Sequence, residues 1–262
     1  MCFDIDSTPP VSAGPEPANG SPLTLTSADG TALSAFLARP ERPSGIGIVV
    51  LPDIRGLFPF YELVALRLAE QGHSALAMDY FGRTAGTGPR DENFRPMEHI
   101  VRVTRPTLDA DIMAAAEYLR GPCDCRVTVA LGFCFGGRQA FFASAPKFGF
   151  AGVIGFYGMP GLYPNGAAGP TQHAAELAAP ILGLFGGDDH GISEQELDAF
   201  DTALTAADVE HEFVVYPGAP HSFFDVKYAE HATACADAWN RVLAFIRKHE
   251  RCGRSFEAQW SS

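Results

Sequence analysis

From Ile46 onward, the chain alternates short continuous apolar runs with longer amphipathic segments. Continuous apolar runs are typical of parallel strands buried on both faces, and the amphipathic segments between them are typical of crossover helices. The predicted strands are Ile46–Leu51, Ser74–Met78, Val127–Leu131, Gly152–Phe156, Ile181–Phe185 and Glu212–Tyr216. The predicted helices are Tyr61–Gln71, Leu108–Arg120, Arg138–Ala145, Glu194–Ala206 and Lys227–Lys248. The pattern predicts an α/β protein with a doubly wound, mostly parallel sheet.

The residues before Ile46 follow another pattern. Leu23–Ser27 and Leu33–Ala38 alternate apolar and polar side chains on either side of Asp29-Gly30, which predicts an antiparallel hairpin. Residues 1–22 are rich in Pro, Gly, Ser and acidic residues, so we expect a flexible leader there. Because no composition break follows, we expect a single domain over residues 23–250 and a C-terminal tail over residues 251–262.

Composition and charge narrow the function. The 262 residues have a formal net charge of -12, so the surface repels phosphate backbones and anionic lipid. No apolar run approaches the roughly 20 residues of a membrane-spanning helix. We therefore expect a small-molecule partner rather than nucleic acid or a membrane. The N-terminus lacks secretory features, which predicts a cytoplasmic protein whose six cysteines are thiols. Cys123 and Cys125 have no second pair at zinc spacing, so no metal is expected.

A strand, a tight turn and a helix surround Cys134 in the predicted fold. The string Gly132-Phe133-Cys134-Phe135-Gly136-Gly137 fits the nucleophile elbow G-x-(S/C)-x-G. The glycines are needed because the turn packs its backbone against neighbouring segments, and the helix start favours a thiolate. We predict that Cys134 is a nucleophile. The alternative is a buried structural cysteine between glycines.

The candidate partners of Cys134 follow later strands, where open α/β sheets bind ligands. His221 follows the last strand and is the candidate base. Asp188 and Asp189 both follow Ile181–Phe185, and either one is suitable to orient the imidazole. Three other histidines compete for the base role but follow no final strand: His99, His173 and His190.

The loop after Ile46–Leu51 lies where this fold places half of an oxyanion hole. The backbone N–H groups of Ile54 and Phe135 are therefore the candidates for stabilising the oxyanion. Asp53 has two interpretations: it tunes the thiol, or it is a turn residue bonded to its own backbone. Tyr157, just beyond Gly152–Phe156, is a candidate for a pocket wall.

The motifs around Cys134, Asp189 and His221, together with Asp79-Tyr80-Phe81-Gly82-Arg83, resemble the dienelactone hydrolase family from about Ile46 to Lys248. The resemblance implies an α/β-hydrolase fold and carboxymethylenebutenolidase-type chemistry, in which an acylated cysteine is hydrolysed. It also implies Asp189 rather than Asp188 as the acid, since the family's acid directly precedes a histidine. A triad and an oxyanion hole suffice for acyl transfer, so no cofactor is expected.

The resemblance further implies a substrate that carries a carboxylate, clamped by two arginines. Arg83 matches one of them, but Asp225 stands at the other position, four residues after His221. The family has a glutamate where Asp53 stands, and this implies the thiol-tuning role. Residues 83–105 contain five arginines: Arg83, Arg90, Arg95, Arg102 and Arg105. This segment is either a solvated loop with surface ion pairs or a loop that supplies the missing cation.

Two other functions fit the same sequence. One is a broad esterase or thioesterase, and the other is a non-catalytic small-molecule binder that keeps the fold. Activity across lactones, esters and thioesters distinguishes the first from a lactone hydrolase. An acyl adduct on Cys134 distinguishes an enzyme from a binder. The sequence leaves the oligomeric state open.

Overall fold

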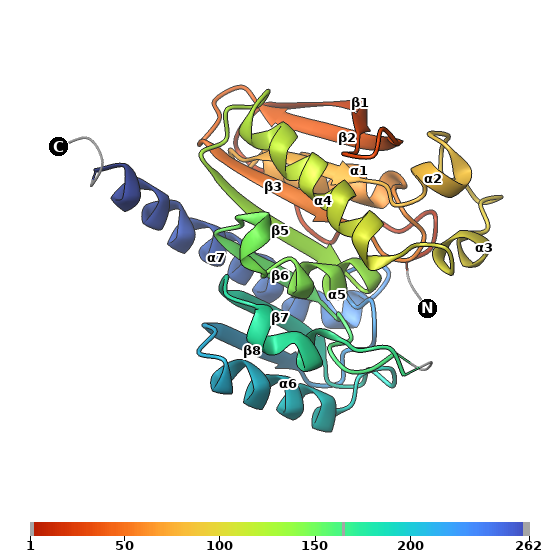
Figure 1. The fold of residues 1–262 in the computed structure, drawn as a ribbon, viewed down its shortest axis with the longest axis vertical. Helices are drawn as coiled ribbons and strands as arrows, with labels where there is room; N and C mark the ends of the chain where they lie inside the picture. Colours follow the sequence, from red (N-terminus) through yellow and green to blue (C-terminus); the bar gives the residue numbers. More distant parts are fainter. Residues whose placement is uncertain (1–2, 164–165, 259–262) are drawn as a thin grey trace.

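The structure, a computed structural model, describes residues 3–163 and 166–258. One eight-stranded sheet has the order β1-β2-β4-β3-β5-β6-β7-β8 (Figure 1). The strands are β1 (Ala18–Thr26), β2 (Ala32–Pro40), β3 (Ile46–Leu51), β4 (Ser74–Met78), β5 (Val127–Phe133), β6 (Gly152–Phe156), β7 (Ile181–Gly186) and β8 (His211–Tyr216). The β1–β2 and β2–β4 pairs are antiparallel, and the other pairs are parallel. This arrangement confirms the predicted fold class, including the N-terminal hairpin.

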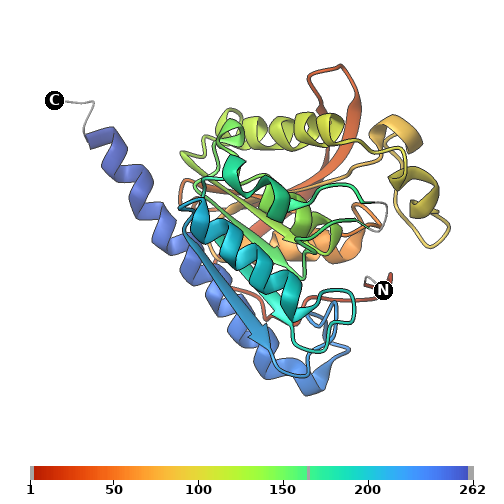
Figure 2. The same ribbon diagram turned by 60° about the horizontal axis from the view of Figure 1, so that its bottom comes forward.

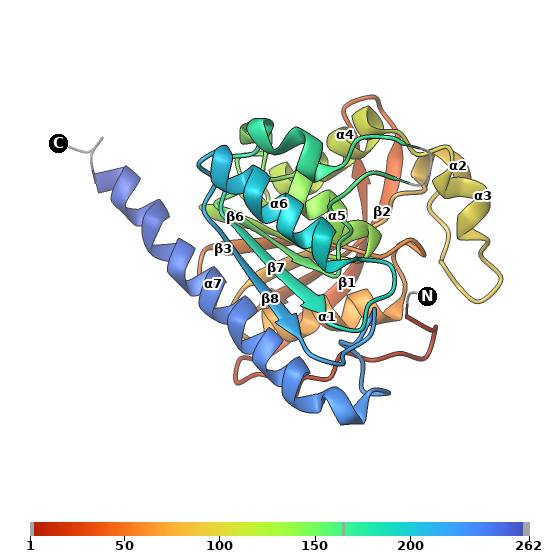
Figure 3. The same ribbon diagram turned by 90° about the horizontal axis from the view of Figure 1, so that it is seen from below.

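Helices cover both faces of the sheet (Figure 3). One face carries α1 (Pro59–Ala69) and α7 (Ala232–Ala258), and the other carries α4 (Arg105–Arg120), α5 (Phe135–Phe142) and α6 (Glu194–Ala206). Every residue of β3 to β7 is therefore buried, which is why these strands have continuous apolar sequences. The shorter elements are α2 (Gly82–Ala85), α3 (Pro96–Ile100) and the 3-10 turns η1 (Pro146–Phe148), η2 (Pro170–Glu176) and η3 (Ala229–His231).

Four of the five predicted helices have other bounds in the structure. Helix α1 begins and ends two residues earlier, α4 begins at Arg105 instead of Leu108, and α7 begins at Ala232 instead of Lys227. Helix α5 begins at Phe135 instead of Arg138, because Cys134 turns the chain directly into the helix. Helix α7 continues past Lys248 to Ala258 and extends beyond the sheet (Figure 2), so it covers most of the predicted tail. Residues 259–262 of that tail lie outside the described residues.

Part of the predicted leader is packed against the protein. Strand β1 begins at Ala18, inside the segment expected to be flexible. Phe3 is only 3% exposed and stacks on Phe60, with ring centroids 3.8 Å apart. The Pro- and Gly-rich composition of residues 1–22 predicts flexibility, and it gives no sign that the Phe3 ring inserts into the core. Residues 1–2 lie outside the described residues.

Membrane-spanning helices, metal sites and disulfides each depend on particular residues of the chain. None of the described helices combines the length and apolarity needed to cross a membrane. Over residues 3–163 and 166–258, no group of three or more His, Cys, Asp or Glu is arranged to hold a metal ion. Four cysteines take part in no disulfide: Cys123, Cys125, Cys134 and Cys235.

Candidate active site

Cys134 occupies the turn between β5 and α5. Its φ of 53° lies in the left-handed region, which is strained for a residue other than glycine. The Cys134 N–H donates to the Phe156 carbonyl at 2.9 Å. A Cβ on Gly132 would lie 2.0 Å from the Gly136 carbonyl oxygen, and a Cβ on Gly136 would lie 2.0 Å from that of Leu51. Both glycines are therefore required for the reason predicted, and the second contact places the turn against the end of β3.

His221 and Asp189 lie on the loops that follow β8 and β7. His221 Nδ1 is 2.6 Å from Asp189 Oδ2, and the Asp189 side chain is 2% exposed. Asp189 Oδ1 accepts the Gly191 N–H at 2.9 Å, so both carboxylate oxygens are engaged. This orients the imidazole and leaves Nε2 for another partner. Asp188 is exposed, so of the two aspartates that the sequence offered, the structure brings Asp189 to the histidine.

The three competing histidines lie elsewhere. His190 is exposed. His173 Nδ1 is 2.9 Å from Glu176 Oε1, within η2. The His99 ring stacks on Phe94, with centroids 5.0 Å apart. Of the four histidines considered, His221 is the one that contacts Asp189.

Tyr157 connects the Cys134 turn to the histidine loop. Its ring is fully buried, and its centroid lies 5.0 Å from that of His221. Tyr157 directly follows Phe156, the residue whose carbonyl accepts the Cys134 N–H. The two loops therefore meet around this tyrosine. Its position suits a wall beside the imidazole, and contact with substrate stays a prediction.

Ile54 and Phe135 lie on two segments that the fold brings together. The Tyr80 hydroxyl donates to the Pro52 carbonyl at 2.8 Å, and the Tyr80 ring centroid lies 5.3 Å from that of Phe135. Among the described residues, neither the Ile54 N–H nor the Phe135 N–H donates a hydrogen bond. Two such backbone donors flanking a nucleophile are what an oxyanion hole requires.

Asp53 is a fully buried carboxyl on the same loop. Oδ1 accepts the Arg55 N–H at 2.8 Å, as the turn interpretation predicts. Oδ2 is buried and makes no hydrogen bond to a described residue. Burial raises the pKa of Asp53 to about 6, whereas the Arg55 N–H and the Tyr61 hydroxyl act to lower it. Oδ1 therefore forms the turn, and the thiol-tuning role of Asp53 stays a prediction.

Arg83 and Asp225 occupy the two positions where the resemblance implies a carboxylate clamp. Both side chains form hydrogen bonds with other groups of this chain. Arg83 donates to Asp29 at 2.9 Å, to Ser27 at 3.1 Å and to Asp111 at 2.5 Å, which ties α2 to the β1–β2 hairpin and α4. Among the described residues, it makes no hydrogen bond or ion pair with Cys134, Asp189 or His221.

The second position holds a buried carboxylate. Asp225 is 3% exposed, and its Oδ1 accepts the backbone N–H groups of Thr8 at 3.4 Å and Lys227 at 3.2 Å. The side chain therefore binds the chain's own backbone.

The arginine-rich segment is less solvated than expected. Arg90 is 2.7 Å from Asp79, and their side chains are 3% and 0% exposed. Arg105 is 2.7 Å from Asp109, and its guanidinium carbon lies 3.7 Å from the Phe142 ring centroid. The Arg90–Asp79 pair is thus a buried structural pair, whereas Arg95 and Arg102 are exposed, so the interpretation as a solvated loop holds for only part of this segment. A role of this segment in binding an anion stays a prediction.

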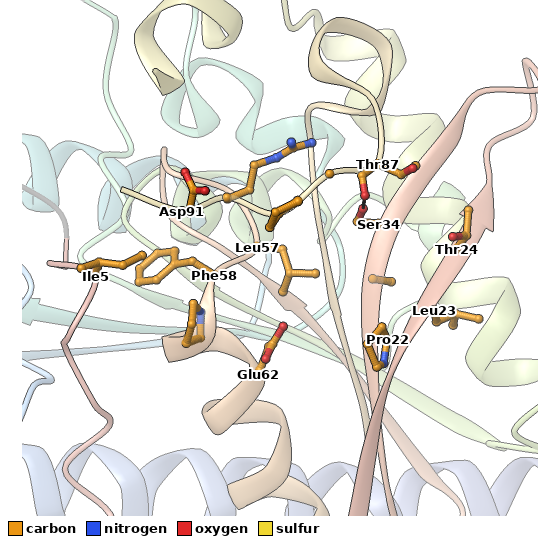
Figure 4. A pocket seen from close by; sticks show the side chains of 15 residues that line it. Ile5, Pro22, Leu23, Thr24, Ser34, Leu57, Phe58, Glu62, Thr87 and Asp91 are labelled. Atoms are coloured by element: carbon orange, nitrogen blue, oxygen red, sulfur yellow. Dashed lines mark hydrogen bonds between the residues drawn. The ribbon is translucent and has the colours of Figure 1, made fainter. Parts of the chain in front are cut away.

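A cavity of about 530 Å³ lies between β1, β2, the segment 87–91 and the start of α1 (Figure 4). Its walls are mainly apolar and include Leu57 and Phe58. Glu62 also lines it, and burial raises the pKa of this carboxyl. Cys134 and His221 are not among the lining residues, so the cavity is separate from the predicted catalytic centre.

Three side chains that support the site were not predicted from the sequence. The Tyr61 hydroxyl accepts the Asp53 N–H at 2.9 Å, and Tyr80 holds Pro52, so two tyrosines fix the loop after β3. Arg138 is buried, and its guanidinium donates to the backbone carbonyls of the segment after β6. Its sequence signal was a charged residue one helical turn after Cys134 in an otherwise apolar stretch.

Comparison with known proteins adds to this geometry. A sequence model described as "Dienelactone hydrolase family" matches residues 33–250. A protein of Escherichia coli (strain K12) named "Putative carboxymethylenebutenolidase" is 29% identical over 244 residues, which cover 90% of this chain and 89% of that protein. A protein of Bradyrhizobium sp named "Probable 2-oxo-3-(5-oxofuran-2-ylidene)propanoate lactonase" is 29% identical over 238 residues, covering 86% and 93%.

Solved structures share the fold. The "Crystal Structure of Putative Dienelactone Hydrolase from Klebsiella pneumoniae subsp. pneumoniae MGH 78578" has a TM-score of 0.76 and 27% sequence identity, covering 88% of this chain and 99% of that one. The Pyrococcus furiosus esterase Pf2001 has a TM-score of 0.62 at 14% identity, covering 92% and 98%. These matches confirm the predicted α/β-hydrolase fold.

Proposed function

Because the chain belongs to the dienelactone hydrolase family, we propose that it hydrolyses a small ester or lactone through an acyl-cysteine intermediate on Cys134. In this proposal His221 is the base and Asp189 orients it. The observation that carries the proposal is the 2.6 Å contact between His221 Nδ1 and the buried Asp189 carboxylate, on loops that meet the Cys134 turn around Tyr157.

The first half-reaction acylates the cysteine. His221 takes the proton of the Cys134 thiol, and the thiolate attacks the substrate carbonyl carbon. The Ile54 and Phe135 N–H groups stabilise the negative oxygen of the tetrahedral intermediate. As this intermediate collapses, the bond to the alkoxy oxygen breaks and the imidazolium returns its proton to that oxygen. In a lactone, the released hydroxyl stays attached to the acyl group.

The second half-reaction restores the thiol. A water molecule loses a proton to His221 and attacks the thioester carbonyl, again with the oxyanion held by the two N–H groups. Collapse breaks the carbon–sulfur bond, the imidazolium returns its proton to the Cys134 sulfur, and a carboxylic acid is released. The Asp189 carboxylate stabilises the imidazolium at both stages, which requires the short contact to Nδ1.

The lactone version of the activity is supported by the relative named as a lactonase. A broad esterase is the second candidate, and a specific observation favours it: Arg83 and Asp225 are both engaged by protein groups. A substrate without a carboxylate needs no clamp at these positions.

A substrate panel tests the proposal. We expect hydrolysis of small lactones and of p-nitrophenyl acetate near neutral pH, measured as kcat/KM. Cys134→Ala should lower kcat/KM by at least about 10³-fold, because the nucleophile is lost. Cys123→Ala, which removes a thiol at the end of α4, is the matched control and should keep the activity. Equal activity in both variants would exclude Cys134 as the nucleophile.

A further inference from the structure

Residues 3–9, here called the N-terminal strap, are bound at one end to the loop after β3. Arg55 Nη1 donates to the Phe3 carbonyl at 2.6 Å, and the Phe3 ring stacks on Phe60 with centroids 3.8 Å apart. Ile5 lies beside Phe58 at the start of α1 (Figure 4). This end of the strap therefore contacts the segment that carries Asp53 and the Ile54 N–H.

The Phe3 ring also contacts aromatic rings next to Cys134 and His221. Its ring centroid lies 6.2 Å from that of Phe133, the residue before Cys134, and 6.2 Å from that of Tyr157, which contacts His221. The backbone of Phe3 helps to stabilise the ionised form of Asp53, which lowers the pKa of that carboxyl. A single residue of the strap thus contacts three parts of the site.

The other end of the strap is bound to the loop that carries His221. The Val226 N–H donates to the Thr8 carbonyl at 3.1 Å, and the Thr8 N–H donates to Asp225 Oδ1 at 3.4 Å. Lys227 pairs with Asp4 at 3.1 Å and also with Asp6. These contacts join the strap to the segment 225–227, four to six residues after the catalytic histidine.

The strap is itself held in a compact turn. The Asp4 N–H donates to Ser7 Oγ at 3.0 Å, and the Ser7 N–H donates back to the Asp4 carbonyl at 3.1 Å. Ser7 is buried although it precedes the first strand. A turn that is bonded internally and at both ends behaves as a brace between the two loops rather than as a loose leader.

We propose that the N-terminal strap is a positioning element of the active site, with Phe3 as its main positioning residue. The strap holds the loop of Asp53 and Ile54 and the loop of His221 in a fixed relation, so that the imidazole and the oxyanion donors meet the same carbonyl. The proposal rests on the proposed function. Its physical basis is that a displacement of about 1 Å, caused far from the chemistry, costs up to about 10²-fold in rate.

Removal of the strap contacts tests this proposal in the full-length chain. Phe3→Ala should lower kcat for p-nitrophenyl acetate about 10- to 100-fold while KM changes less than about threefold, because alignment is lost rather than binding. Phe3→Leu, which keeps an apolar side chain, should recover most of the rate. Phe150→Ala is the matched control, since Phe150 is also buried but packs on Phe148. It should lower the melting temperature without lowering kcat.

A second readout does not depend on turnover. Deletion of residues 1–9 should speed amide hydrogen exchange in both segments that the strap joins, 53–57 and 219–227, while exchange in β5 stays slow. If the unmodified chain hydrolyses no ester or lactone, the proposed function fails, and the exchange measurement still decides whether the strap braces the loops. The strap proposal is overturned if folded Phe3→Ala keeps kcat within twofold, or if only one of the two segments exchanges faster.

Discussion

Asp53 shows how one buried residue serves two purposes. Its Oδ1 closes the turn by accepting the Arg55 N–H, and this part of its role was readable from the sequence Pro52-Asp53-Ile54-Arg55-Gly56. Its raised pKa was not, because the burial that raises it depends on how the whole chain packs around this loop. A carboxyl whose pKa is raised to about 6 exchanges its proton close to neutral pH, which suits it to the predicted thiol-tuning role.

The stability of the protein should depend on Asp53 in a pH-specific way. Its folded pKa of about 6 exceeds the ordinary value of 3.8, so the folded state binds this proton more tightly than the unfolded state. The stabilisation that the folded state gains from the protonated Asp53 is therefore complete below pH 3.8, decreases up to about pH 6, and is absent above it. At pH 8, Asp53→Asn should unfold at a higher urea concentration than the wild type, because its free energy of unfolding is larger by on the order of 2–3 kcal/mol. Near pH 4 the two proteins should differ little.

The comparison needs a neutral reference. Asp91→Asn, in an exposed loop, changes the net charge by the same amount as Asp53→Asn but removes no buried carboxyl. It should leave the urea midpoint nearly unchanged at both pH values. A stabilisation by Asp53→Asn that is equally large at pH 4 and pH 8 would show that titration of this carboxyl is not the cause.

At the scale of elements, the predicted catalytic pair of Asp189 and His221 depends on two loops that follow the neighbouring parallel strands β7 and β8. A Cβ on Gly186 would lie 2.3 Å from the Ala219 carbonyl oxygen, so the ends of β7 and β8 pack closely. This close approach brings Asp189 to His221. The adjacent Asp188 lies one residue away in the same loop and is exposed, which makes the two aspartates a natural matched pair.

Asp189→Asn should lower kcat about 10²- to 10⁴-fold with little change in KM, because the imidazole loses the carboxylate that orients it and stabilises its charge. Asp188→Asn should stay within twofold of the wild type. Steady-state kinetics with p-nitrophenyl acetate checks both variants. A larger loss from the Asp188 variant would mean that the loop adopts another arrangement during catalysis.

Predictability from sequence differed among the elements for physical reasons. Strands β3, β4 and β6 have the predicted bounds because each is a short, mainly apolar run that is buried along its whole length. Helix α6 begins as predicted because the Ser193 side chain accepts the Glu196 N–H. Helix α5 began earlier than periodicity indicated, since its first turn contains glycines and its start is set by the strained Cys134.

At the scale of the whole molecule, the contact between Asp189 and His221 was predicted and the surroundings of these residues were not. Cys134, Asp189 and His221 follow strand ends in a fixed chain order, and parallel strands bring such ends to one edge. The partners of Arg83 and the anchors of Phe3 could not be predicted. Asp29 and Asp111 lie far from Arg83 in sequence, and nothing in the composition of residues 1–22 connects Phe3 with Phe60.

Mass spectrometry after a brief reaction with p-nitrophenyl acetate tests whether Cys134 carries the acyl group. The reaction is quenched in acid within the first turnovers, and the digested peptides are compared between the wild type and Cys134→Ala. If Cys134 is the nucleophile, the peptide that contains Cys134 gains one acetyl group. The corresponding peptide of the variant gains none, and the variant releases no p-nitrophenol above background. An acetyl group on another residue during turnover, or continued turnover by Cys134→Ala, would contradict this role of Cys134.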